Sequence, residues 1–231
     1  MRKWIFWFCA LCAVLPLQAA ADAQAVLYGQ LVLPADVGTQ KRAFRAALYR
    51  NRQTPAERKE GGREKKDQAP AENAIISAHP TSFSVDVQPL SESVEIEQVE
   101  VSFGPRVTPV TVGTTVEFIN HDAIYHNVFS LTPGARFNIG RHPTGDIVAK
   151  EVEVAGNVDL FCDIHPQMHG VILSLDTPYF TRANADGSYR LEGLPPGTYQ
   201  VRVFHPDLQP TLVEVDLQPG QELVRNFNLV K

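Results

Sequence analysis

The chain has 231 residues, of which 44% are hydrophobic, and a formal net charge of −5. This mild acidity disfavours nucleic acid as a partner, because binding to a phosphate backbone needs clustered lysine and arginine. The length allows one large or two small domains with real cores.

Residues 1–23 have the features of a secretory signal peptide. Arg2 and Lys3 precede an apolar run over residues 4–17, and small residues with A-x-A cleavage sites follow. The run is shorter than the ~18 residues of a spanning helix, and no second run follows it, so we expect no membrane span. The sequence therefore predicts a protein exported to the periplasm or beyond.

Only one cysteine lies outside this leader. Cys9 and Cys12 stand inside the apolar run, and no small-residue pattern of a lipoprotein leads into either, which disfavours the alternative of a lipid anchor. Cys162 is then the only cysteine of the mature part. Cysteines in an oxidising compartment normally pair, so a lone one is buried in a core, bridges two chains or is held by chemistry.

The N-terminal region after the leader contains two strand-like runs. Residues 25–50 hold "AVLYGQLVL" and "FRAALYR", separated by a connection with Pro, Asp and Gly. Residues 51–72 have almost no apolar side chains and carry charges of both signs. We interpret them as a charged linker or loop, with a basic docking patch as the weaker alternative.

Short runs rich in Val, Ile and Phe follow one another through residues 73–178, with turn residues between them. No long segment has the helical period, so the pattern predicts an all-β sandwich or barrel. The alternation slips between Ile96 and Val99, which indicates either a β-bulge or a misplaced strand boundary.

Residues 180–231 form a second, thinner series of four strands. Asp186 and Gly187 supply a hairpin signal, and a Pro-Pro-Gly turn follows at residues 195–197. Four strands make a small sheet whose apolar face needs a cover. We therefore expect this region to borrow strands from elsewhere in the chain.

The segment "FCDIHPQMHG" places a thiol, an imidazole and a thioether on one loop between two strands. Cys162, His165 and Met168 stand at three-residue steps, and His126 begins another strand-like run. One thiolate with two imidazoles and a weak axial methionine is the ligand set of a blue-copper electron-transfer site. Taken singly, each residue is more simply read as core or surface; together they indicate a copper site.

The C-x2-H-x2-M spacing, the upstream "HNV" and Asn120 resemble the cupredoxins, and the short loop resembles their amicyanin and plastocyanin-like branch. This resemblance implies a Greek-key sandwich with one type 1 copper ion held by His126, Cys162, His165 and Met168. It implies that Asn120 ties the two ligand loops together. His121 is the alternative first imidazole, although the residues after His126 match the family better.

The cupredoxin resemblance also implies a route for electrons. His165 would reach the surface through an apolar patch made by residues such as Ile124, Pro143, Pro166 and Met168. A redox protein partner of unknown identity would dock there over a small area.

The C-terminal region, residues 180–231, resembles the regulatory β-sandwich of carboxypeptidases, a prealbumin-like fold. Such modules normally begin with strands like those at residues 25–50. We therefore expect either a small sandwich split by the copper domain or, as the simpler alternative, a long cupredoxin with an independent tail. The tail has no evident catalytic group, so its expected role is docking to a partner or an envelope component.

The sequence thus predicts an electron carrier and not an enzyme. A periplasmic copper carrier or chaperone, or a structural cupredoxin without redox role, is the alternative. A nucleophilic role for Cys162 would need an orienting third group and a substrate pocket, and it would leave Met168 unexplained.

Overall fold

The computed structural model describes residues 23–37 and 68–231, and it is almost entirely β-structure. The expected strand at residues 44–50 lies outside these ranges. The strands are β1 (Ala25–Val32), β2 (Ile75–Pro80), β3 (Val94–Gln98), β4 (Phe103–Gly104), β5 (Val107–Thr111), β6 (Thr115–Asn120), β7 (His126–Ser130), β8 (Phe137–His142), β9 (Ile147–Glu151), β10 (Gly156–Phe161), β11 (His169–Leu175), β12 (Phe180–Arg182), β13 (Ser188–Leu194), β14 (Gly197–Phe204), β15 (Thr211–Leu217), β16 (Glu222–Val224) and β17 (Phe227–Asn228), with one short 3-10 helix, η1 (Pro70–Asn73). The predicted all-β fold class is confirmed.

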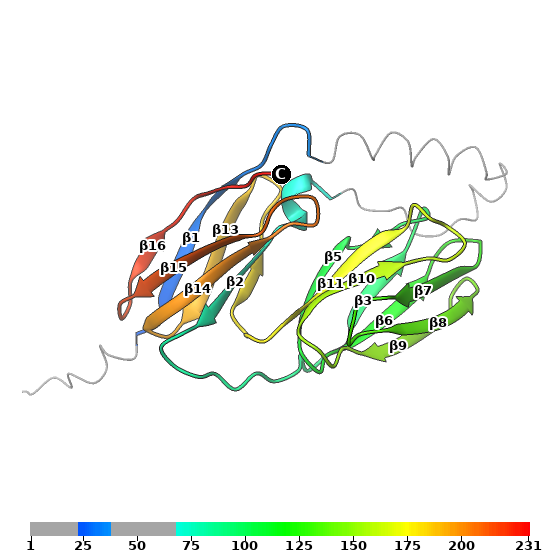
Figure 1. Cartoon of the computed structure of the whole chain (residues 1–231), viewed down its shortest axis with the longest axis horizontal. Helices are drawn as coiled ribbons and strands as arrows, with labels where there is room; N and C mark the ends of the chain where they lie inside the picture. Colours follow the sequence, from blue (N-terminus) through cyan, green and yellow to red (C-terminus); the bar gives the residue numbers. More distant parts are fainter. Residues whose placement is uncertain (1–22, 38–67) are drawn as a thin grey trace, which may run out of the picture.

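Strands β3 to β11 build a two-layer unit, which we call the central sandwich (Figure 1). One sheet has the order β5-β11-β10-β7-β8 and the other the order β4-β3-β6-β9. Alternating side chains from both layers, such as Ile96, Phe118, Leu160 and Ile172, are at most 1% exposed and form a single apolar core. Period-two alternation explains why each strand buries one face.

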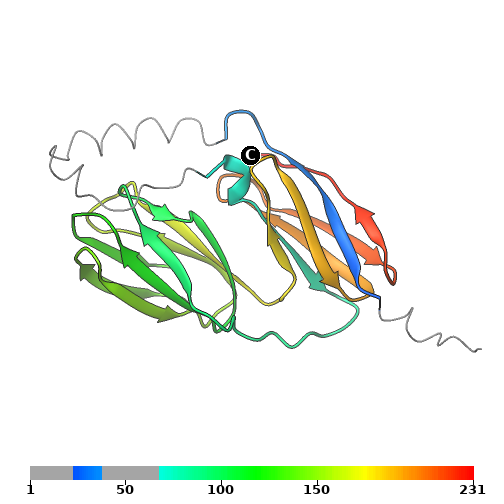
Figure 2. The ribbon, with the colours of Figure 1, turned by 180° about the vertical axis from the view of Figure 1, so that it is seen from behind.

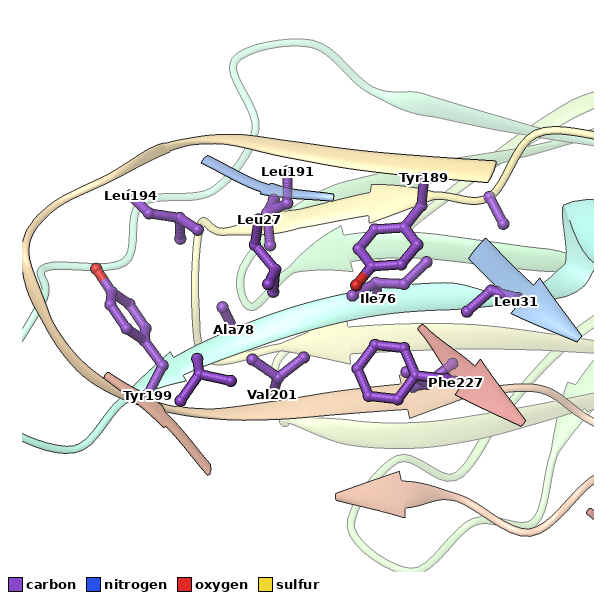
Figure 3. Close-up of a cluster of buried hydrophobic side chains, with 14 of the residues drawn as sticks. Leu27, Leu31, Ile76, Ala78, Tyr189, Leu191, Leu194, Tyr199, Val201 and Phe227 are labelled. Carbon is purple, nitrogen blue, oxygen red and sulfur yellow. The ribbon is translucent and has the colours of Figure 1, made fainter. Parts of the chain in front are cut away.

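The remaining strands build a second two-layer unit, the terminal sandwich. β1 pairs antiparallel with β13 and parallel with β16 and β17, and it faces the sheet β12-β2-β14-β15. Figure 3 shows Leu27, Ile76, Tyr189 and Phe227 pointing towards one another between these layers. The described part of the chain therefore enters this sandwich at β1, leaves it before β3 and returns to it after β11.

Strand β2 lies in a different unit from the one expected for residues 73–178. It pairs antiparallel with β14 along its whole length and with β12 on its other side. Ile76 and Ala78 point into the core of the terminal sandwich, where both are fully buried. The strands of the central sandwich begin only at β3, so the sequence boundary at residue 73 was placed too early.

The two sandwiches lie side by side, as both views show (Figures 1 and 2), and they touch through a third apolar cluster. Ile75 and Phe204 of the terminal sandwich contact Val107, Val171, Leu173 and Leu175 of the central one. The Arg106 guanidinium also binds the Asp207 carboxylate through two hydrogen bonds of 2.5 and 2.9 Å. Apolar contact and a two-point ion pair therefore join the units at one end.

Across the two described ranges, no helix has the length and hydropathy that crossing a bilayer requires.

Candidate metal centre

Two neighbouring strands bring the candidate ligands to one end of the central sandwich. β7 begins at His126, and β10 ends at Phe161, directly before Cys162. The two strands run antiparallel, with Phe161 opposite Phe129. The start of one antiparallel strand lies beside the end of its neighbour, so His126 meets the loop of residues 162–168.

Three ligand atoms converge at this end of the sandwich. One atom from each of His126, Cys162 and His165 lies within 4.8 Å of the other two. The two Nδ1 atoms are 3.0 Å apart, and Cys162 Sγ is 3.7 Å from His165 Nδ1. The three residues are 0%, 4% and 9% exposed, respectively, so their lone pairs are turned away from water. Such enclosure of converging lone pairs suits a bound cation.

The Asp122 carboxylate fixes the orientation of the His126 ring. Its Oδ2 lies 2.8 Å from His126 Nε2 in a contact where the two side chains are 3% and 0% exposed. An ionised carboxylate only accepts hydrogen bonds, so Nε2 carries the proton and Nδ1 keeps a free lone pair. Burial lowers the pKa of His126, but the hydrogen bonds with Asp122 and Cys162 outweigh it and raise that pKa. Such a carboxylate partner also makes an imidazole a more basic ligand.

The same carboxylate holds a strained turn between β3 and β4. Glu100 and Val101 have φ values of 50° and 54°, which is unusual for residues with side chains and an outlier for a β-branched one. Their backbone N–H groups donate to Asp122 Oδ1 and Oδ2 at 2.7 and 2.9 Å. Asp122 therefore joins a turn on one sheet to a candidate ligand on the other. Sequence reasoning missed Asp122; its place four residues before His126 in "DAIYH" was the available signal.

The environment of Cys162 favours a thiolate. Burial raises the pKa of the thiol, but a hydrogen bond with His126 and the backbone N–H groups of Asn127, Ile164 and His165 lower it further than burial raises it. Cys162 is a free cysteine. Only the thiolate is a good nucleophile or metal ligand, so the pKa favours the form that a metal needs.

Met168 lies inside the protein. Its backbone N–H donates to the His165 carbonyl at 2.9 Å, which closes a tight turn in the loop. The side chain is fully buried and belongs to the same apolar cluster as Cys162. The expected place of Met168 in a surface patch is therefore wrong, whereas Ile124, Pro143 and Pro166 are exposed.

Asn120 has a role that differs from the expected one, whereas His121 lies outside the three-ligand cluster, in line with the preference for His126. The Asn120 amide donates to the carbonyls of Ile124 and His142, and its Oδ1 accepts the Asp122 N–H. These bonds shape the loop before His126; none of the three reaches the loop that carries Cys162. His121 Nε2 lies 3.7 Å from the Glu97 carboxylate, outside the three-ligand cluster.

The donor set decides which ions suit this site. Sulfur and imidazole donors bind both zinc and copper. The methionine thioether on the same loop favours copper, because zinc sites do not use this ligand. One thiolate, two imidazoles with Nδ1 directed inward and a buried methionine on the same loop are thus chemically suited to copper.

A family model described as a carboxypeptidase regulatory-like domain matches residues 170–230. The match begins within β11 of the central sandwich and covers the terminal sandwich from β12 to β17. No curated protein matches the chain.

Among solved structures, the chain is similar to cupredoxins. It is 26% identical to a Cu-containing nitrite reductase from Thermus scotoductus SA-01, with a TM-score of 0.36; the match covers 42% of this chain and 26% of that one. A purple cupredoxin from Nitrosopumilus maritimus is 24% identical over 36% of this chain and 99% of its own, with a TM-score of 0.33. A reduced amicyanin variant is 20% identical over 39% and 97%, with a TM-score of 0.35. This chain thus spans about a quarter of the reductase and nearly all of the two smaller proteins.

Proposed function

We propose that this protein holds one type 1 copper ion at His126, Cys162, His165 and Met168 and carries single electrons between redox partners. The observation that carries the proposal is the convergence of three buried ligand atoms within 4.8 Å. When bound, copper supplies a one-electron redox couple.

The protein's own groups prepare the site for that role. Asp122 keeps a proton on His126 Nε2, so Nδ1 stays available as a donor. The amides around Cys162 favour its thiolate. Strands β7 and β10, a hydrogen-bonded turn and an apolar core hold these groups in place, which limits rearrangement when the charge of the site changes.

Access to the surface differs between the two imidazoles. His126 is fully buried, whereas His165 is 9% exposed and is followed by the exposed Pro166. Ile124 and Tyr125 are 38% and 58% exposed in the loop before His126. We propose that a redox protein partner docks over this face, at His165. Redox contacts of this kind are small in area.

Copper transport is the alternative function. A carrier that passes copper on needs ligands that a partner can reach, and here the ligands are at most 9% exposed. Burial therefore favours electron carriage. Cys162 is 4% exposed, so a substrate has little access to its sulfur, which favours a carrier over an enzyme.

Voltammetry combined with a chelator challenge separates these two functions. The purified copper-loaded protein should give a reversible one-electron wave and should keep its copper in excess Cu(I) chelator through repeated cycles. An irreversible wave, with copper lost to the chelator on reduction, would favour the copper-handling function.

We further propose that the protein works after export to the periplasm or beyond, and that the terminal sandwich docks it to an envelope component. The signal-peptide pattern in residues 1–23 supports export, and the match of residues 170–230 to a carboxypeptidase regulatory-like domain supports a separate role for the terminal sandwich. Fractionation of cells that produce the full chain tests export: recovery in the cytoplasm with residues 1–23 intact would contradict it.

A further inference from the structure

The two sandwiches leave a cleft of about 510 Å³ beside their apolar contact, since Leu173 and Leu175 belong to both. Its walls come from both units: the outer face of β2, β14 and β15 on one side and the end of β11 on the other. Sites for small ligands occur preferentially at domain interfaces and have volumes of this order.

Strand alternation explains which side chains face the cleft. Tyr199, Val201 and Val203 of β14 point into the terminal core, so Gln200 and Arg202 point the other way. Gln200 lies opposite His79 on β2, and Arg202 lies opposite Leu212 on β15. The cleft wall is therefore a continuous row of polar groups with a leucine beside it.

The imidazole in this row is held in place. Ser77 Oγ lies 3.0 Å from His79 Nε2, and the Asp176 carboxylate lies 2.8 Å from His79 Nδ1. This is the hydrogen-bond order of a hydrolytic triad. Ser77, however, is 1% exposed and does not line the cleft, so its hydroxyl is not presented to a substrate. The arrangement therefore supports binding and not acyl transfer.

The guanidinium in the row has room for an anion. Within residues 23–37 and 68–231, the side chains of Arg202 and Gln200 have no hydrogen-bond or ion-pair partner. Arg202 is partly buried, and a partly buried cation gains most from a planar two-oxygen acceptor such as a carboxylate. The one carboxylate among the lining residues, Asp176, is already paired with His79.

The opposite wall of the cleft contains two leucines beside Ser174 and Asp176. Leu173 and Leu175 are 1% and 3% exposed there, whereas Leu212 on the facing side is 55% exposed, a large apolar side chain that a ligand would cover. A guanidinium and an amide beside three leucines match a molecule with an anionic head and an apolar body.

We propose that this cleft is a binding site for a small amphipathic carboxylate, with the carboxylate on Arg202 and Gln200 and the apolar body on Leu173, Leu175 and Leu212. The site is separate from the candidate metal centre, so the proposal does not rest on copper binding.

Nuclear magnetic resonance titration of the purified protein with hexanoate tests this proposal, with hexylammonium as a probe of the same tail and opposite charge. Hexanoate should bind saturably and shift the backbone amides of Gln200, Arg202 and Leu173, and hexylammonium should not. Arg202→Gln should weaken hexanoate binding about tenfold or more. The control Arg225→Gln, exposed between β16 and β17, should bind like the unmodified protein.

Three results would overturn the proposal: no saturable shift with hexanoate, equal binding of hexylammonium, or unchanged hexanoate affinity in Arg202→Gln. The comparison of the two probes needs no substitution, so it stays decisive even if a variant folds poorly.

Discussion

The central and terminal sandwiches share a two-layer architecture but differ in what they enclose. The apolar cluster of the terminal sandwich contains two tyrosines, Tyr189 and Tyr199, whose hydroxyls donate to backbone carbonyls at 2.6 Å, and the buried histidine of this sandwich, His205, is bonded to the Pro70 carbonyl. The central core continues at one end into buried polar residues: Asn120, Asp122, His126, Asn127, His142 and His165. Buried titratable groups cost stability unless they are partnered or bind something, so this end of the central sandwich is where a function is expected.

The largest expected effect is a loss of stability when a large side chain is removed from the core of the central sandwich. Phe118 is fully buried in the central core, with its ring 6.0 Å from that of Phe137. Phe118→Ala should lower the free energy of unfolding by about 3–5 kcal/mol because it removes a large side chain and leaves a cavity. Urea denaturation followed by circular dichroism measures this, with the exposed Leu212→Ala as control. A loss below about 1 kcal/mol would contradict the assigned core.

The next effect concerns the polar end of the central core. Three donors converge on the Asp122 carboxylate: the N–H groups of Glu100 and Val101 and the His126 ring. An asparagine offers one acceptor oxygen and turns an NH2 towards the other donors. Asp122→Asn should therefore weaken Cu(II) binding roughly 10- to 100-fold, as measured by competition with a chelator of known affinity.

The matched control for that experiment is Asp163→Asn, in the ligand loop but with an exposed carboxylate that binds Arg141. Equal losses in both variants would indicate that general charge, and not the hydrogen bond to His126, matters.

A smaller effect is expected where the two sandwiches meet. Arg106 and Asp207 are 15% and 22% exposed and form a two-point ion pair, whereas Arg190 pairs with Glu222 while 47% exposed. Arg106→Ala should cost about 1–3 kcal/mol, because it removes two charge-assisted hydrogen bonds to a partly buried carboxylate. Arg190→Ala should cost less than about 1 kcal/mol. If both variants unfold alike in urea, the contact between the sandwiches contributes little.

The smallest effect is a pH dependence in the terminal sandwich. Burial lowers the pKa of His205, and its hydrogen bond to the Pro70 carbonyl only partly opposes this. Below pH ~6.5 the unfolded state therefore binds more protons than the folded state, and stability should fall as the pH falls. His205→Gln, which can still donate to Pro70, should flatten this dependence in unfolding measurements from pH 8 to 5. Identical slopes in the two proteins would sink the assignment.

Much of the candidate site could be predicted from the sequence because three of its four candidate ligands are close together along the chain. Cys162, His165 and Met168 stand on one loop, and their spacing predicts their meeting without knowledge of the fold. The structure also brings His126, and not His121, to Cys162. The role of Asp122 could not be predicted, because it depends on a turn at residues 99–102 that approaches from the other sheet.

The remaining differences arise from contacts that a local pattern does not encode. The slip in alternation at Ile96 to Val99 is the end of β3 and the tight turn after it. Strand β2 has an alternation that would suit either sandwich, and only its pairing with β14 decides between them. Met168 could face outward or inward on a short loop, and the turn closed on His165 directs it inward.

The most direct test of the account is visible absorption and electron spin resonance of the purified protein with one equivalent of Cu(II), recorded beside Cys162→Ser and the control Ser174→Ala. The account predicts an intense visible band and a narrow copper hyperfine splitting that are lost in Cys162→Ser and kept in Ser174→Ala. A pale spectrum that Cys162→Ser leaves unchanged would contradict it.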